Sequence, residues 1–194
     1  MDPTTLLIGT GKVYVAAVGT AFPALTATPG ASWTDLGVMQ DGLELTPERE
    51  IKEIEVDSES GPVEAVITKE QLVLKTKLAE GTLENLAKVL GQTVTDTAPG
   101  AGTIGTREIP MYKGVGRVSR YAFLFRGETL SPYGTTYPAQ YELPVGYFAG
   151  ATGMAFKKGD NAQIPVEFHA LVDPNAATAT AKFGRLIAQD AAAF

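Results

Sequence analysis

Apolar and polar residues alternate with a period of two along much of this chain, which is the pattern of β-strands with one buried face. The 21 glycines and 12 prolines are spread throughout and supply frequent turn signals. Many short strands between turns indicate a mainly β fold. The pattern predicts strands over residues 49–56, 63–68, 71–78, 117–125, 137–143 and 164–171, and the β-branched and apolar run at residues 12–18 predicts one more.

Two of the predicted strands are close enough in sequence to form a hairpin. The sequence REIKEIEV, residues 49–56, leads through SESGP into VEAVIT, residues 63–68. A short turn between two strands joins them in antiparallel pairing, so we expect a long β-hairpin here.

Residues 82–91 have a helical period instead. Four residues fall on one face of a helix: Leu83, Leu86, Ala87 and Leu90. Thr82 is suited to cap the N-terminus, and Gly91 is the residue type expected just beyond the end. We expect a short amphipathic helix whose leucines pack on the sheet, where their transfer from water is worth roughly 5–9 kcal/mol. A weaker helical signal, interrupted by Gly184, predicts a C-terminal arm over residues 181–194.

Every second residue from 53 to 59 is acidic: Glu53, Glu55, Asp57 and Glu59. In an extended strand these carboxylates would share one face at a spacing of about 7 Å. Their mutual repulsion would be about 2.4 kcal/mol per pair at an effective dielectric constant near 20, so we expect the row to be solvated.

The size and charge of the chain narrow its class. Its 194 residues are enough for one domain with a substantial core, which we expect to span residues 1–194. The net charge of −6 argues against a surface that grips nucleic-acid phosphates. The chain contains no cysteine, and none of its apolar runs is long enough to span a bilayer. We therefore expect a soluble, unprocessed protein made in the cytoplasm, without a membrane partner.

Two glycine-containing motifs have ordinary explanations. Gly100, Gly102 and Gly105 spell GxGxxG, but a dinucleotide site needs a strand before the motif and a helix after it. We expect loops over residues 93–106 and 127–136 instead. The sequence DSESG, residues 57–61, places its glycine at the wrong position for a calcium-binding loop.

Catalytic candidates are few. The chain has a single histidine, His169, and Glu167 lies on the same face of that predicted strand. A histidine-dependent catalytic site would have to combine His169 with Glu167 or Asp173. A hydrogen-bonded surface histidine is the simpler interpretation. The carboxylates of residues 48–59 could in principle supply an acid and a base, but a solvated face explains them better. We expect no catalytic, cofactor-binding or metal-binding residues.

The predicted hairpin is followed directly by the predicted helix, and this order of elements resembles that of a known protein family. The stretches WTDLGVMQDGLEL, EREIKEIEVDSESGPVEAVITKE and LAEGTLENLAKVLG, between residues 33 and 91, are similar to the tail tube proteins, or major tail proteins, of long-tailed bacteriophages. The sequence IPVEFHALVDP, residues 164–174, resembles the last core strand of that family.

The resemblance implies a β-sandwich or partly open barrel with one flanking helix, residues 82–90, and a long extended hairpin arm, residues 47–72. In this family six copies form a ring with a continuous inner β-barrel, and rings stack into a hollow tube. The arm would reach the neighbouring ring, with its tip formed by Ser58, Glu59, Ser60, Gly61 and Pro62.

The resemblance also implies a function and a set of partners. The protein would be a structural virion protein of the tail, and double-stranded DNA would pass through the tube during ejection without specific binding. Besides its own copies, its partners would be a tape-measure protein, a tail terminator and the distal tail or tip proteins. Non-specific DNA binding arises mainly from contacts of Lys and Arg side chains with the phosphates. An acidic bore would lack such contacts and would therefore not hold the DNA. We hypothesise that Glu53 and Glu55 face the bore or its rim, although contact between rings is the other explanation for this stretch.

A second class of function is compatible with the same pattern. A monomeric β-sandwich binding module, such as a phage head decoration or an adhesion domain, would also show short alternating strands. The two differ in whether the protein polymerises.

Overall fold

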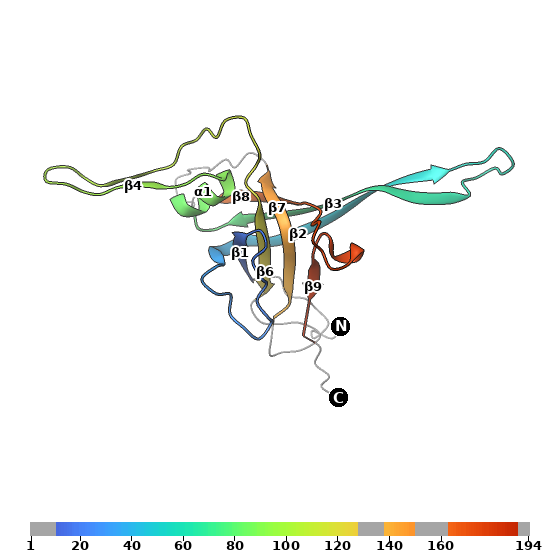
Figure 1. Cartoon of the computed structure of the whole chain (residues 1–194), viewed down its shortest axis with the longest axis horizontal. Helices are drawn as coiled ribbons and strands as arrows, with labels where there is room; N and C mark the ends of the chain where they lie inside the picture. The colour runs from blue at the N-terminus through green and yellow to red at the C-terminus, as the bar shows by residue number, and fades with distance from the viewer. Residues whose placement is uncertain (1–10, 128–137, 150–162, 190–194) are drawn as a thin grey trace.

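The computed structural model describes residues 11–127, 138–149 and 163–189. In this part of the chain it is mainly β, with one α-helix (Figure 1). Part of the predicted loop at residues 127–136 and the last residues of the predicted C-terminal arm lie outside it. The elements are β1 (Gly11–Ala17), β2 (Thr34–Ile54), β3 (Glu64–Leu78), α1 (Leu83–Leu90), β4 (Thr95–Thr97), β5 (Thr106–Glu108), β6 (Tyr121–Gly127), β7 (Gln140–Ala149), β8 (Ile164–Ala170) and β9 (Arg185–Ile187).

Seven strands form one antiparallel sheet in the order β6-β1-β2-β3-β8-β7-β9. β6 also pairs with β7, so the sheet curls back on itself around the core. β7 pairs with β8 only over residues 146–149, while residues 140–142 pair with β9 instead. The result is a curled, partly open sheet and not a closed barrel.

The core lies inside this curled sheet, and in β8 it follows the predicted alternation. In β8, Ile164, Val166 and Phe168 are buried, whereas Pro165 between the first two is exposed. The ring of Phe168 packs against that of Phe123 in β6, with centroids 4.9 Å apart. Aliphatic side chains from β1, β2 and β3 complete the cluster: Val13, Val15, Leu36, Leu74 and Leu78.

A smaller cluster covers the other face of β1 and β6. Trp33 packs there on Ala122 and Leu124, and Phe22 lies against the indole ring at a centroid distance of 5.2 Å. The segment between β1 and β2 therefore acts as a lid on these two strands. Burial on both faces explains why β1 is almost continuously apolar, since a strand covered on both sides needs no polar alternation.

Helix α1 begins and ends where the sequence predicts. The Thr82 hydroxyl accepts a hydrogen bond from the Asn85 backbone N–H at 3.2 Å, and Gly91 adopts a left-handed conformation with φ of 64°. The Asn85 side-chain amide is buried and donates to the backbone carbonyl oxygens of Leu36 and Glu80, at 3.0 and 3.1 Å. A polar residue thus anchors the helix to the sheet.

The side chains that α1 buries differ from the three leucines expected to pack. Ala87 and Val89 are buried, Leu86 is half-buried against the main core, and Leu90 is half-buried. Leu83 is 41% exposed. The anchor through Asn85 turns the helix so that its first leucine faces outward.

Leu86→Ala is expected to destabilise the protein by about 2 kcal/mol, the low end for removing a leucine from a core, because the side chain is only partly buried. Leu83→Ala is the matched control on the same helix, and its exposed side chain should contribute less than about 0.5 kcal/mol. Urea denaturation of both variants measures the difference. Equal effects would show that both leucines face the same environment.

β2 and β3 form one long antiparallel hairpin, paired from Met39 and Leu78 to Ile54 and Glu64 with two shifts of register on the way. The strands predicted separately at residues 63–68 and 71–78 are one strand, β3. We call residues 47–72 the β2–β3 arm. Figure 1 shows this arm projecting far from the core.

The loop predicted over residues 93–106 is interrupted by short strands, and the weak helical signal near the C-terminus forms no α-helix in the described residues. Residues 93–106 were expected to be a loop, but β4 and β5 pair there as a second hairpin, from Thr95 with Glu108 to Thr97 with Thr106. The helical signal near the C-terminus is replaced by a single 3-10 turn at Ala179–Ala181 and by β9. Gly184, with φ of 96°, separates the two, so a helix cannot continue through it.

Candidate assembly interface

The β2–β3 arm has two open strand edges. Among the described strands, β2 beyond Val38 pairs only with β3, and residues 64–72 of β3 pair only with β2. Each edge therefore presents a row of backbone N–H and C=O groups without a partner strand. Such edges are prone to pair with another chain, and soluble monomers usually protect them.

The arm also exposes apolar side chains. Ile51 and Ile67 lie directly opposite each other in the ladder, and their residues are 62% and 54% exposed. Four further aliphatic residues of the arm are exposed: Ile54, Val56, Val63 and Val66. A two-stranded ribbon has no core to bury them, so their burial requires a contact with another molecule.

The turn at the end of the arm is compact and acidic. The Val63 N–H donates to the Ile54 carbonyl oxygen at 2.9 Å, and the Glu59 N–H donates to that of Val56 at 3.1 Å. We call residues 55–63 the acidic tip. It contains the five residues predicted for the tip, all exposed: Ser58, Glu59, Ser60, Gly61 and Pro62.

The row of four carboxylates does not persist as one strand face. β2 ends at Ile54, so Glu53 lies in the ladder opposite Ala65, and Glu55 lies just beyond the end of the strand. Both are exposed, as are Asp57 and Glu59 in the turn. The carboxylates are solvated as expected, but they surround the tip instead of lining one side of the arm.

Ion pairs cross the base of the arm. Arg49 Nε lies 2.8 Å from Glu70 Oε1, and Lys69 Nζ lies 3.3 Å from Glu50 Oε1. All four side chains are largely exposed, so each pair contributes about 0.2–1 kcal/mol at most. Their clearer effect is to fix the positions of Arg49 and Lys69.

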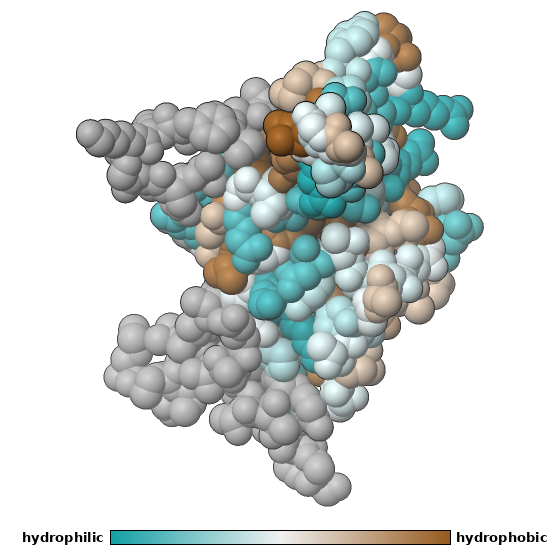
Figure 2. Space-filling view, turned by 90° about the vertical axis from the view of Figure 1, so that its left-hand side faces the viewer, coloured by the Kyte–Doolittle hydropathy of each residue, from teal (hydrophilic) through white to brown (hydrophobic). Residues whose placement is uncertain are grey.

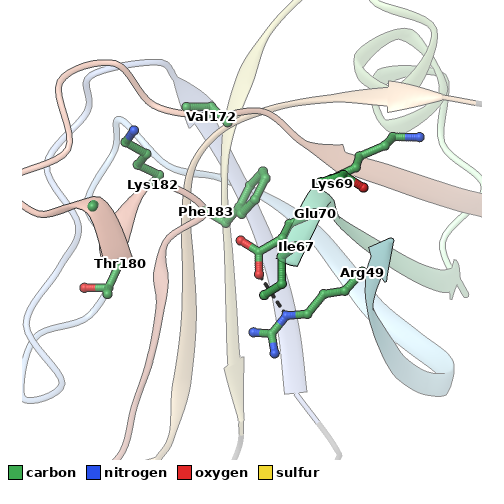
Figure 3. A pocket seen from close by; sticks show the side chains of 10 residues that line it. Arg49, Ile67, Lys69, Glu70, Val172, Thr180, Lys182 and Phe183 are labelled. Atoms are coloured by element: carbon green, nitrogen blue, oxygen red, sulfur yellow. Dashed lines mark hydrogen bonds and ion pairs between the residues drawn. The ribbon is translucent and has the colours of Figure 1, made fainter. Parts of the chain in front are cut away.

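An open cavity of about 660 Å³ lies between the base of the arm and the C-terminal segment. We call it the basal cavity; Figure 3 shows side chains from both segments around it. The arm contributes Arg49, Ile67, Thr68, Lys69 and Glu70, and the C-terminal segment contributes Val172, Ala179, Thr180, Lys182 and Phe183. Its wall combines apolar groups with three cations and one carboxylate.

The C-terminal wall of this cavity is attached to the sheet through β9. Arg185 Nε donates to Glu142 Oε2 at 2.8 Å, and the Gln140 side-chain amide donates to Glu142 Oε1 at 2.6 Å. Gly184 approaches the Glu142 carbonyl so closely that a Cβ would lie 1.8 Å from the oxygen. These contacts hold Lys182 and Phe183 beside the arm.

The second hairpin, β4–β5, projects from the opposite side of the core (Figure 1). Arg107 binds both carboxylate oxygens of Asp96, at 2.8 and 3.1 Å, and also pairs with Glu84 of α1. The hydrogen bond and charge of Asp96, with the charge of Glu84, raise the pKa of Arg107. Arg107 therefore links the β4–β5 hairpin to helix α1.

The same side of the molecule carries further exposed apolar residues. Ile104 at the end of the hairpin is 86% exposed, and three residues of the following segment are also exposed: Met111, Tyr112 and Val115. Figure 2 faces this side and shows apolar side chains scattered among polar ones. Alternation in sequence gave no signal for this hairpin, because its two strands have three residues each.

The candidate chemical sites have structural explanations in the described residues. His169 Nε2 lies 2.7 Å from Glu167 Oε1, and its ring stacks on Tyr147 at 5.5 Å. Asp173, the other possible partner of the histidine, instead accepts a hydrogen bond from the Asn175 N–H. The GxGxxG glycines lie in the β4–β5 connection and lead into a strand, not a helix.

No group of three or more metal-binding side chains of His, Cys, Asp or Glu occurs within residues 11–127, 138–149 and 163–189. None of the helices found in those ranges is long and apolar enough to cross a membrane.

Comparison with known proteins identifies the family. A family model described as phage tail tube protein matches residues 1–124, which is more than half of the chain and includes the β2–β3 arm, α1 and the β4–β5 hairpin. A search of curated proteins finds no match. The chain therefore belongs to the phage tail tube proteins and is a structural protein of the bacteriophage tail.

Proposed function

We propose that six copies of this chain form a ring, that the rings stack into a hollow tube, and that the β2–β3 arm joins successive rings. The observation that carries this proposal is the arm itself, with two open edges and the exposed pair Ile51 and Ile67. A ribbon of this kind gains stability only when another chain covers it.

The tube would conduct double-stranded DNA into the host during ejection. Every copy adds a net charge of −6, so the assembly is strongly anionic and would repel the DNA backbone. In this proposal Glu53 and Glu55 face the bore or its rim. A density map of the tube that places both carboxylates on the outer surface would contradict that assignment.

The remaining partners follow from the same role. A tube of defined length requires a tape-measure protein in the bore, a terminator at one end and tip proteins at the other. The protein would be made in the host cytoplasm and would act in the virion, without a cofactor and without catalysis.

Electron microscopy of the purified protein tests the proposal. We expect tubes or stacked rings in negative stain at high protein concentration, and a β2–β3 arm that resists protease only after assembly. A monomer at every concentration in analytical ultracentrifugation, with an arm that is protected from the start, would instead support a monomeric binding module.

A further inference from the structure

We propose that the basal cavity of one copy receives the acidic tip of a second copy. The inference rests on the proposed function, in which the arm joins neighbouring copies, and adds where the tip binds. The occupant of the cavity is thus the turn of that tip, residues 56–63, of an identical chain.

Charge is the first argument. The turn of the acidic tip carries Asp57 and Glu59, and the tip contains no basic residue. The cavity wall presents Arg49, Lys69 and Lys182 against one carboxylate, that of Glu70.

The available positive charge is centred on one side chain. Arg49 pairs with Glu70, and Lys69 pairs with Glu50, whereas Lys182 has no carboxylate partner among the described residues. Lys182 is therefore the cation of the cavity wall whose charge is available to an anionic segment that enters the cavity. Opposite charges at such a contact speed association and fix its register.

Apolar groups on the two surfaces also correspond. The tip is flanked by Val56 and Val63, which are 41% and 51% exposed. The cavity wall includes Ile67, Val172 and Phe183. A volume near 660 Å³ falls in the range of pockets that enclose a small ligand, which is comparable to a few side chains of a turn.

The geometry excludes pairing within one chain. The tip and the cavity lie at opposite ends of the same arm, since the tip begins beyond Ile54, which is about 17 Å along the strand from Arg49 at the rise of a strand. A paired ribbon cannot fold back over that distance onto its own base. The contact must therefore join different copies.

Such a contact is head-to-tail. Each copy would use its tip on one neighbour and its cavity on another, so two different surfaces meet at every junction. Repetition of a contact between two different surfaces gives an open string or a ring, not a closed two-fold dimer. A string of copies joined in this way has two different ends. A tube with a terminator at one end and tip proteins at the other needs this polarity.

Cysteine cross-linking tests the contact, because the chain has no native cysteine. We expect the double variant Glu59→Cys, Lys182→Cys to form a ladder of covalent oligomers under mild oxidation at concentrations that give tubes. Each single variant should give dimers at most. The pair Arg117→Cys, Lys182→Cys is the matched control, since Arg117 lies outside both surfaces, and it should give no ladder.

Charge exchange provides a second readout. Lys182→Glu and Glu59→Lys are each expected to raise the lowest concentration that gives tubes at least tenfold, and the combined variant should recover most of the loss. Arg117→Glu should leave that concentration unchanged. Circular dichroism confirms that each variant is folded.

The outcomes separate this inference from the proposed function. Wild-type tubes together with an absent ladder, or with an unchanged assembly concentration for Lys182→Glu, would overturn the docking site and leave the tube intact. A wild-type chain that forms neither tubes nor rings would overturn the proposed function itself.

Discussion

A chain in which Asn-Gly replaces residues 52–66 is expected to fold normally and to form no tubes. The replaced segment lies beyond the pair Ile51 and Ile67, and its residues are exposed and contribute nothing to the core. Asn-Gly is a favoured two-residue hairpin turn, so the shortened arm can close. The melting temperature should therefore change by only a few degrees, while assembly is lost because the segment that reaches the next copy is gone.

Electron microscopy and sedimentation at matched concentrations measure this effect. A suitable control replaces residues 99–104, in the β4–β5 connection, by Asn-Gly, which shortens the other hairpin and leaves the β2–β3 arm whole. Tubes of normal appearance from the chain with the shortened β2–β3 arm would contradict the role given to that arm. A large fall in melting temperature would instead show that the removed segment supports the fold.

Phe168→Ala is expected to cause the largest loss of stability, about 3–5 kcal/mol. The side chain is fully buried, and its ring packs on Phe123 and Phe148, with centroids 4.9 and 5.3 Å away. Gly146 leaves the space that the ring occupies, since a Cβ there would lie 2.3 Å from it. Rigid strands on both sides prevent the cavity from collapsing.

Thermal and urea denaturation measure this loss, which corresponds to a fall in melting temperature of roughly 10 °C for a domain of this size. Tyr112→Ala is the matched control, because that aromatic side chain is exposed and should change stability by less than about 0.5 kcal/mol. A small effect of Phe168→Ala would mean that the sheet repacks freely around β8.

Local patterns predicted the central elements well, because the signals are local. The turn sequence SESGP joins two alternating stretches, and the structure pairs them as one hairpin. The cap at Thr82 and the left-handed Gly91 delimit α1 as expected. These features depend on residues within a few positions of each other, which a sequence displays directly.

The rotation of α1 was not predictable in the same way. The helical period alone placed Leu83 on the packed face, but the buried amide of Asn85 fixes the helix through the carbonyl oxygen of Leu36. That partner lies 49 positions earlier in the chain. A hydrogen bond across such a separation leaves no trace in a local pattern.

The basal cavity is invisible in the sequence for a related reason. Its walls come from residues 49–70 and 172–183, and the pairing of β9 with β7, together with the contact of Arg185 with Glu142, holds the second segment beside the first. The β4–β5 hairpin was missed because its strands are too short for alternation to be detected. What the sequence did indicate was the acidity of the tip.

One extra residue near the base of the arm has a consequence for the dimensions of an assembly. Between the pairs Glu50 with Lys69 and Ile51 with Ile67, Thr68 has no opposite residue, and its hydroxyl donates to the Glu50 carbonyl oxygen at 3.2 Å. A bulge of this kind bends and twists a ribbon at one point. In a stack of copies joined through their arms the same bend would recur at every step, so this single threonine would help to set the pitch of the whole tail.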